Sequence, residues 1–432
     1  MSLKFYTAIL ICLLLITANI YGQTELIANK KEHKEINKLV KKKSVQLALK
    51  TIDDIDNETI TNMIVLTEIP APPFKETVRA KKFVEMLTEV GVDSIWIDKE
   101  GNVLALRKGT KGAKNIVLDA HLDTVFPFET DVTVKVEGNT YTAPGIGDDT
   151  RGLAMLLTVL KAMNTANIKT EENVYFIGTV GEEGLGDLRG VKHLFSPTSD
   201  ITINSWISID GGGPGRIITG GLGSKRYKAL FKGKGGHSWG AFGLANPHHA
   251  LGTAISIFTK KASEYTNRKG EKTSFNIGRI GGGTSVNSIP FESWMEVDMR
   301  SLSASRLLEI DGIFKMSMKE AEIAYNATGI KDKVILEIIP IGDRPSGKLA
   351  DATPLVQHAI ASSITLGIKP TLTTSSTNSN IPIARNIPAI TLSRGGKGSR
   401  AHSLDEYWQN VDGAKNIKLA LLVVLAQAGI SN

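Results

Sequence analysis

Two histidines and several carboxylates stand where predicted strands of this chain end. The first histidine is His121, which follows the apolar run of residues 115–118. Asp123 comes two residues later, so it can hydrogen-bond the ring nitrogen that a bound metal leaves free. Imidazole nitrogens and carboxylate oxygens are common zinc ligands. This pair alone is not diagnostic, because a histidine near the end of a strand is more often structural.

Two pairs of adjacent carboxylates occur among glycines. Asp148 and Asp149 open a predicted helix, and one of them can serve as its N-cap. Glu182 and Glu183 directly follow the strand predicted over residues 174–179. Adjacent carboxylates can divide the work, since one can bind a metal while the other acts as a general base with a raised pKa.

A further carboxylate and a second histidine complete the set. Asp210 ends the strand predicted over residues 206–210, and His402 lies in a Gly-rich segment before the last predicted helix. Ligands of open α/β sheets collect beyond the carboxyl ends of the strands, so we expect all these side chains on one sheet edge. Such nitrogen and oxygen ligands fit a two-metal hydrolytic site, most naturally for zinc.

The elements that carry these residues alternate between strand and helix, which predicts an α/β domain with a largely parallel central sheet. From about residue 222 the predicted order becomes βαββαβ, which is typical of a ferredoxin-like split βαβ sandwich. The α/β pattern returns after Arg344. We therefore expect one domain from residues 51–221 and 344–432, with a small domain of residues 222–343 inserted into it.

The motifs, in this order and with this insertion, resemble the co-catalytic zinc exopeptidase family, which includes peptidase T, glutamate carboxypeptidase, aminoacylase and succinyl-diaminopimelate desuccinylase. The resemblance covers about residues 60–430. It implies a hydrolase of peptide or amide bonds that uses two Zn2+ ions, with Co2+ or Mn2+ as substitutes. It also implies roles for seven residues: His121 and Asp210 as ligands of the first metal, Glu183 and His402 as ligands of the second, Asp148 as the bridging carboxylate, Asp123 as the orienting partner of His121, and Glu182 as the general base.

The same resemblance extends to the inserted domain. His237 resembles the lid histidine that reaches a neighbouring subunit's active site and stabilises the oxyanion, which implies a homodimer formed through this domain. Asn287 and Arg300 resemble substrate-binding positions, with turn stabilisation and a surface ion pair as the alternatives. Asn378 departs from the pattern, because it lies in a polar run where relatives often carry an acidic residue.

The expected substrate is a short peptide, and Asp210 in place of Glu resembles the peptidase side of the family. An N-acyl-amino-acid deacylase or a carboxypeptidase on the same metal site is the alternative. A distant alternative is a serine hydrolase, because residues 236–240 spell G-x-S-x-G around Ser238. That motif needs a strand that turns straight into a helix, and the glycines and Pro247 that follow delay any helix. A secreted binding protein with a dead site is disfavoured, since each metal and base position holds a competent residue.

The N-terminus predicts export. Residues 1–22 read as a signal peptide, with Lys4 before an apolar stretch and small residues near the expected cleavage after Gly22; an uncleaved anchor is the alternative. The only cysteine, Cys12, lies within it, so the mature chain has neither disulfides nor thiolate ligands. We expect a periplasmic or extracellular protein with no transmembrane domain after cleavage.

The positive charge of the chain is local. The chain has 432 residues, 41% of them hydrophobic and 22% charged, which is typical of a globular protein. Residues 30–50 hold eight lysines and two glutamates, so they account for +6 of the net charge of +7. With aromatic residues at only 6%, this pattern argues against a nucleic-acid partner. Residues 23–50 are interpreted as a solvated, Lys-rich leader or a first helix rather than as a binding site.

Overall fold

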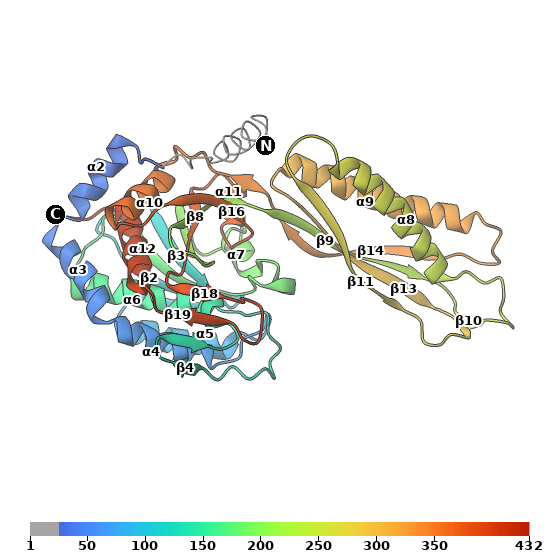
Figure 1. Cartoon of the computed structure of the whole chain (residues 1–432), viewed down its shortest axis with the longest axis horizontal. Coiled ribbons are helices and arrows are strands. Elements are labelled where there is room, and N and C mark those ends of the chain that lie inside the picture. The colour runs from blue at the N-terminus through green and yellow to red at the C-terminus, as the bar shows by residue number, and fades with distance from the viewer. Residues whose placement is uncertain (1–25, 432) are drawn as a thin grey trace, which may run out of the picture.

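The computed structural model describes residues 26–431 (Figure 1). The predicted signal peptide of residues 1–22, including Cys12, lies outside the described residues. Among residues 26–431, no helix is both long enough and apolar enough to span a membrane.

A mixed central sheet organises the larger part of the molecule. Its strands are β1 (Ser94–Ile97), β2 (Val103–Arg107), β3 (Asn115–His121), β6 (Asn173–Thr179), β7 (Ser205–Ile209), β8 (Arg216–Gly221), β15 (Gly347–Lys348), β16 (Thr371–Ser375) and β17 (Ala389–Leu392). They lie in the order β1-β2-β6-β3-β7-β17-β8-β15, and β16 also pairs with β8. The central strands β6, β3, β7 and β17 are parallel to one another. The pairs β1–β2, β2–β6, β17–β8 and β8–β15 are antiparallel, and β16 pairs parallel with β8, so the sheet is more mixed than expected. The expected α/β class is confirmed, with the parallel strands at the centre of the sheet.

Helices cover both faces of this sheet because its central strands are apolar on both sides. The main core lies under α5 (Thr77–Val90), α6 (Arg151–Thr165), α10 (Pro354–Thr365) and α12 (Gly413–Ala428). The other face packs against the short helices α7 (Arg189–Leu194) and α11 (Asn380–Ala384). Most residues of α6 and α12 are buried, as expected for helices that are apolar all round.

Residues 223–344 form a second sheet that projects to one side of the first (Figure 1). Its elements are β9 (Gly223–Lys232), α8 (Pro247–Thr266), β11 (Thr273–Gly282), β13 (Glu292–Ser301), α9 (Ala304–Asn326) and β14 (Ile335–Arg344), in the order βαββαβ. The antiparallel strands lie in the order β11-β13-β9-β14, and both helices pack on the sheet around a separate apolar core. A two-stranded ribbon of β10 (Gly236–His237) and β12 (Ser288–Ile289) lies at its far end (Figure 1).

Residues 30–50 are helical, as the first-helix alternative predicted, and the expectation of a solvated leader is wrong for them. These residues form α2 (Lys30–Leu39) and most of α3 (Lys43–Asp54), which pack against α10, α12 and α6. Ile36, Val45 and Ala48 are completely buried in the main core. The lysines dominate the composition, but they lie between apolar residues whose helical spacing forms one buried face. The next helix, α4 (Asp56–Thr67), continues this packing on α6.

A small sheet that the sequence did not predict holds the loop of His402. It consists of β4 (Lys135–Glu137), β5 (Thr140–Thr142), β18 (Lys397–Ser399) and β19 (Tyr407–Gln409), in the order β18-β19-β5-β4. The loop between β18 and β19 carries His402. Pairing of β19 with β5 ties this loop to the segment that leads to Asp148.

Candidate metal centre

Three parallel strands deliver chemistry-bearing residues to one sheet edge. His121 is the last residue of β3, and the neighbouring strands β6 and β7 are followed by Glu182, Glu183 and Asp210. Because the three strands are parallel, their carboxyl ends meet at the same edge. The sequence predicted these four residues at this edge of the sheet.

Asp148 lies in a short segment, η2 (Ile146–Thr150), in which the backbone of Asp148 and Asp149 is not helical. Gly145 before it has φ 78°, and a Cβ there would lie 2.6 Å from Thr124. The buried carboxylate of Glu406 accepts hydrogen bonds from the backbone N–H groups of Gly145, Gly147 and Asp148 at 2.9–3.1 Å. The Asp148 backbone is therefore fixed by a residue from the far end of the chain.

The side chain of Asp148 lies between two histidines. Its Oδ1 lies 3.0 Å from His121 Nε2 and 3.2 Å from Arg394 Nη1, and its Oδ2 lies 3.5 Å from His402 Nε2. Burial disfavours the carboxylate, but the charge of Arg394 and the hydrogen bonds from both histidines outweigh that effect and hold the pKa of Asp148 well below its usual value. Asp148 is therefore ionised at neutral pH.

The ligand atoms fall into two groups that share Asp148. One group comprises His121, Asp148 and Asp210, and the other comprises Asp148, Glu183 and His402, with all atoms of a group within 4.8 Å of one another. His402 Nε2 lies 2.9 Å from Glu183 Oε1. Imidazole and carboxylate ligands suit a divalent ion such as zinc, so the residues present fit two metals, one of which each group would hold. All five predicted ligands are brought together.

Glu182 lies beside both groups, within the same 4.8 Å distance of His121 and Glu183. Its side chain is buried, and Arg344 Nη1 donates to Glu182 Oε1 at 3.0 Å. Burial raises the pKa of Glu182 well above its usual value, and the positive charge of Arg344 offsets that only in part. A buried carboxyl with a raised pKa is suited to accept and return a proton near neutral pH.

The carboxylate of Asp123 has a different contact from the expected one. His121 Nδ1 lies 2.9 Å from the backbone carbonyl oxygen of Asp123 and 3.7 Å from its carboxylate. The carboxylate instead accepts the backbone N–H groups of Glu182 at 3.0 Å and Glu183 at 2.8 Å. Asp123 therefore orients the histidine through its backbone and the glutamate pair through its side chain. Asp149 does not cap α6, since its carboxylate accepts the backbone N–H of His121 at 3.2 Å.

A cleft of about 510 Å³ opens in front of the metal centre. Arg300 lines it, whereas His237 and Asn287 do not. They lie on the β10–β12 ribbon, where the Asn287 carbonyl accepts the Ser238 N–H and His237 Nδ1 accepts the N–H of Trp239. The structure thus separates these two predicted residues from the metal centre of their own chain.

The serine-hydrolase alternative is not supported by the backbone around Ser238. The residues after β10 form turns, and helix α8 begins only at Pro247. The strand–helix elbow that a nucleophilic serine requires is therefore missing from residues 236–247.

Sequence reasoning missed several residues that support the centre. Asn378 was noted only as a departure, but its buried amide donates to Asp119 at 2.7 Å and to Thr179 at 2.8 Å, beneath the metal ligands. Burial raises the pKa of Asp119 to about 7. Arg344, Arg394 and Glu406 are buried beside the centre, and no pattern in the sequence marked them, because their burial depends on the packed fold.

Arginines surround the mouth of the cleft. Arg226 on β9 and Arg300 on β13 both donate their Nε–H to Asp298, at 2.8 and 2.7 Å. Burial opposes the charge of Asp298, but these two hydrogen bonds outweigh it and lower its pKa. The arginines that line the cleft are Arg216, Arg226, Arg300, Arg344 and Arg394.

Metal-dependent hydrolases of peptide and amide bonds use centres of this kind. The sequence profile of Peptidase family M20/M25/M40 matches residues 117–426, and the chain belongs to this family. It is accordingly a metal-dependent hydrolase of peptide or related amide bonds.

The chain is also similar to individual proteins and solved structures. The chain is 27% identical over 357 residues to the uncharacterized protein YqjE of Bacillus subtilis, which covers 79% of this chain and 91% of that protein. Its fold is similar to that of aminopeptidase PepT from Bacillus cereus, with a TM-score of 0.66 and 21% identity over 86% of this chain and 98% of that one. It is also similar to the YXEP protein of Bacillus subtilis, a dinuclear metal-binding peptidase of the M20 family, with a TM-score of 0.62 and 18% identity over 87% and 99% of the two chains.

Proposed function

We infer that this chain is an exported exopeptidase that hydrolyses short peptides with two zinc ions. The observation that carries the proposal is Asp148, shared by two ligand groups that lie next to the buried Glu182. Two divalent ions in these groups would supply Lewis acidity at the scissile carbonyl.

Glu182 acts as the general base in this proposal. It takes a proton from the attacking water and passes it to the leaving amine, because its raised pKa suits both transfers. Asp123 holds the Glu182 backbone through the hydrogen bond to its N–H, and Arg344 holds its carboxylate. These two contacts keep the proposed base in a fixed position beside the ligand groups.

The arginines of the cleft favour a substrate that carries a carboxylate. Guanidinium groups bind carboxylates through paired hydrogen bonds. Arg226 and Arg300 each contact Asp298 through Nε, and this is the only contact that either guanidinium group makes to an acidic side chain of the described residues. A dipeptide or tripeptide with a free C-terminus satisfies this requirement. An N-acyl amino acid satisfies it as well, so a deacylase or carboxypeptidase activity is the second candidate.

His237 completes the site from a second copy of the chain in this proposal. Within one chain it lies on the β10–β12 ribbon, outside the cleft. Three large apolar side chains lie close to His237 in the sequence or near the ribbon. They are Trp239, Phe242 and Val286, and they are 79–103% exposed. A homodimer formed through the second sheet would cover such side chains and bring His237 and Asn287 to the partner's substrate.

A substrate screen tests the proposal. The purified protein is stripped with a chelator, reloaded with Zn2+, Co2+ or Mn2+, and assayed on tripeptides, dipeptides and N-acyl amino acids. We expect metal-dependent cleavage, fastest on short peptides. Faster hydrolysis of N-acyl amino acids would favour the second candidate. Hydrolysis that survives chelation and is lost in Ser238→Ala would overturn the metal mechanism.

The export part of the proposal has its own test. Signal-peptide cleavage is read from the N-terminal sequence of the protein recovered outside the cytoplasm.

A further inference from the structure

Helix α2 carries a row of lysines without acidic partners. Lys30, Lys34 and Lys38 follow one another at four-residue intervals, and Lys41 comes just after the helix, so all four lie along one side of it. These four residues are named the lysine face. Within residues 26–431 none of them has a carboxylate within 4.0 Å, whereas many other lysines of the body do. Like charges on successive turns repel one another, so this face favours an anionic partner.

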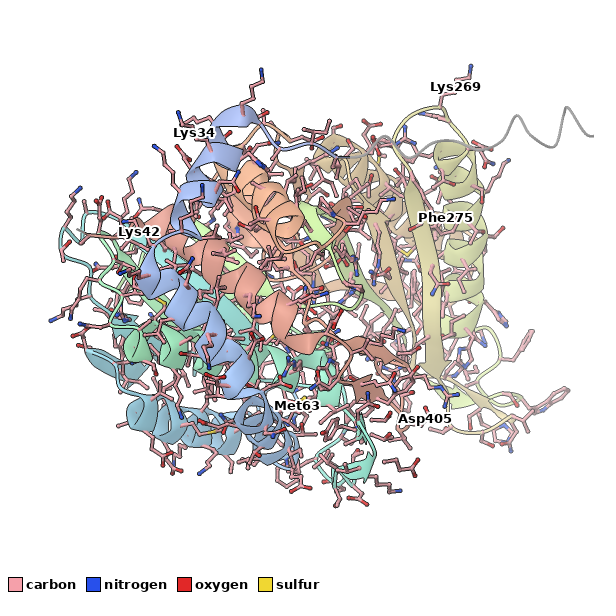
Figure 2. All side chains as sticks on the ribbon, turned by 60° about the vertical axis from the view of Figure 1, so that its left-hand side comes forward. Lys34, Lys42, Met63, Lys269, Phe275 and Asp405 are labelled. Atoms are coloured by element: carbon pink, nitrogen blue, oxygen red, sulfur yellow. The ribbon has the colours of Figure 1, made fainter. Side chains whose placement is uncertain are left out.

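The lysine face is held in a fixed orientation. The opposite side of α2 buries Ile36 and Leu39 in the main core. The backbone N–H of Asn29, at the start of the helix, donates to Gln357 Oε1 at 2.7 Å, and Glu35 pairs with His358 at 2.8 Å. The lysines are therefore displayed by the folded body, and Figure 2 shows Lys34 pointing outward from it.

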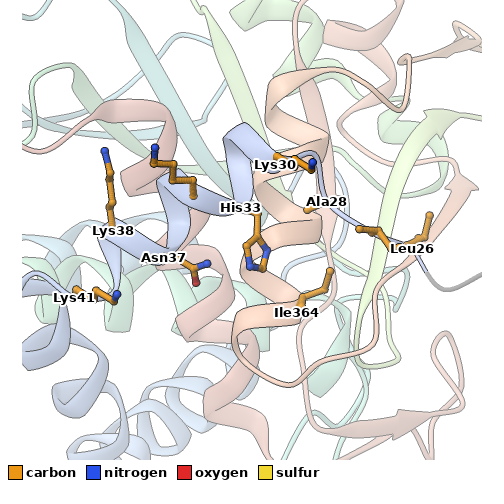
Figure 3. Close-up of a pocket in the computed structure, with 10 residues that line it drawn as sticks. Leu26, Ala28, Lys30, His33, Asn37, Lys38, Lys41 and Ile364 are labelled. Carbon is orange, nitrogen blue, oxygen red and sulfur yellow. The ribbon is translucent and has the colours of Figure 1, made fainter.

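Apolar side chains lie beside the lysines. A surface groove of about 670 Å³ is lined by the lysine face together with Leu26, Ile27 and Ile364 (Figure 3). Ile27 is 82% exposed. None of the residues that line this groove lines the metal cleft.

Lysines around exposed aliphatic side chains match the chemistry of a bilayer surface. Lysines interact with anionic headgroups, and aliphatic side chains enter the boundary between headgroups and acyl chains. The lining residues include no Phe, Tyr or Trp, and His33 is the one aromatic ring among them, so the groove lacks the large stacking surface that single-stranded nucleic acids use. In the sequence, the apolar residues 6–20 come shortly before Leu26, so this end of the chain is the one that meets a membrane during export.

We propose that the lysine face of α2, with Leu26 and Ile27, docks the folded enzyme on a bilayer that contains anionic phospholipids. The contact is peripheral and reversible, because it uses charges and a few aliphatic side chains rather than a spanning helix. Since the groove and the metal cleft share no residue, catalysis by the docked enzyme does not depend on the lysines.

Vesicle co-sedimentation tests the proposal. The protein is mixed with vesicles of phosphatidylcholine and phosphatidylglycerol, or of phosphatidylcholine alone, at low and high salt. Residues 1–22 are apolar and have a membrane affinity of their own, so the full chain and the chain beginning at Gln23 are each compared only with their own variants. The test variant combines Lys30→Gln, Lys34→Gln, Lys38→Gln and Lys41→Gln. The control combines Lys260→Gln, Lys269→Gln, Lys272→Gln and Lys333→Gln, which removes equal charge from the second domain.

Each lysine close to an anionic surface contributes about a fivefold gain in partitioning. We expect salt-sensitive binding to the anionic vesicles, at least about tenfold weaker for the test variant and unchanged for the control, with peptidase activity in solution retained by both. Equal binding of wild type and test variant, or equal binding to both lipid mixtures, would overturn the proposal. So would retention on heparin through these lysines without any vesicle binding, since the partner would then be an anionic polymer.

Discussion

Arg344 and Glu182 form a buried ion pair in which Arg344 Nη1 lies 3.0 Å from Glu182 Oε1. Arg344 also donates to the backbone carbonyl of Glu182 and to the hydroxyl of Ser376. Arg344 comes from the end of β14, so the second sheet contributes directly to the environment of the proposed base. Its charge opposes the effect of burial, which raises the pKa of Glu182.

Substitution of Arg344 therefore changes the pH profile in a defined direction. A general base is active when deprotonated, so activity is lost as the pH falls through its pKa. Without the positive charge of Arg344, the largest effect that opposes burial is lost and the pKa of Glu182 rises further. We expect the acidic limb of kcat/KM to move to higher pH in Arg344→Gln. Arg344→Lys keeps the charge and is expected to stay close to wild type; a limb at the wild-type pH in both variants would contradict the ion-pair argument.

Replacement of Glu182 separates catalysis from metal binding. General acid–base catalysis contributes about 10²–10⁴-fold, so Glu182→Gln should lower kcat by at least that factor. The adjacent Glu183 belongs to a ligand group with Asp148 and His402, so Glu183→Gln should lose metal as well as activity. Elemental analysis of both variants measures their metal content, and steady-state kinetics measures their activity. Together they check that Glu182 acts in catalysis and Glu183 in metal binding. Full activity in Glu182→Gln would remove Glu182 from the mechanism.

His402 should make metal binding depend on pH. Hydrogen bonds with Asp148 and Glu183 raise the pKa of its imidazole to about 10 in the metal-free protein. A metal binds the neutral ring, so binding must displace this proton, and affinity at the second site rises with pH until about pH 10. Competition with a chromophoric chelator between about pH 6 and 9 measures that slope, which is about tenfold per pH unit for one displaced proton. His402→Ala is expected to bind one ion instead of two; two tightly bound ions in that variant would contradict the assignment.

The proposed dimer makes its own prediction. If His237 acts in the partner's site, a heterodimer of His237→Ala and Glu182→Gln contains one site with both residues intact. Mixing the two inactive variants under conditions of subunit exchange should restore about a quarter of wild-type activity, because half of the dimers are then mixed and each has one working site. Recovery should fail on dilution below the dimer dissociation constant measured by sedimentation. No recovery with full exchange would place His237 outside the partner's site.

Much of the metal centre could be predicted because several ligands follow a local signal. His121 ends an apolar strand, Glu183 and Asp210 follow two others, and parallel strands place such residues on one edge whatever the details of packing. Glu406 could not be predicted in the same way, since its partners Gly145 and Asp148 are about 260 residues distant in the chain and no periodic pattern links them. Contacts of this kind depend on the packed fold.

The N-terminal helices were misjudged for a different reason. Composition emphasises the lysines of α2, whereas burial depends on spacing, and Ile36 with Leu39 is enough to attach the helix to the core. The same lysines that argued for a solvated leader lie on the opposite, exposed side of the helix. A helix can therefore be highly charged and still be part of the folded body.

Truncation of a single buried side chain tests whether α2 is part of that body. Ile36 is completely buried, so Ile36→Ala should lower the free energy of unfolding by about 2–5 kcal/mol through lost burial and the cavity left behind. Leu47 on α3 is 47% exposed and provides the control, since Leu47→Ala should change stability by less than about 1 kcal/mol. Urea unfolding of the metal-loaded protein, followed by circular dichroism, compares the two variants. A solvated leader would leave both midpoints at the wild-type value, whereas a packed α2 lowers only that of Ile36→Ala.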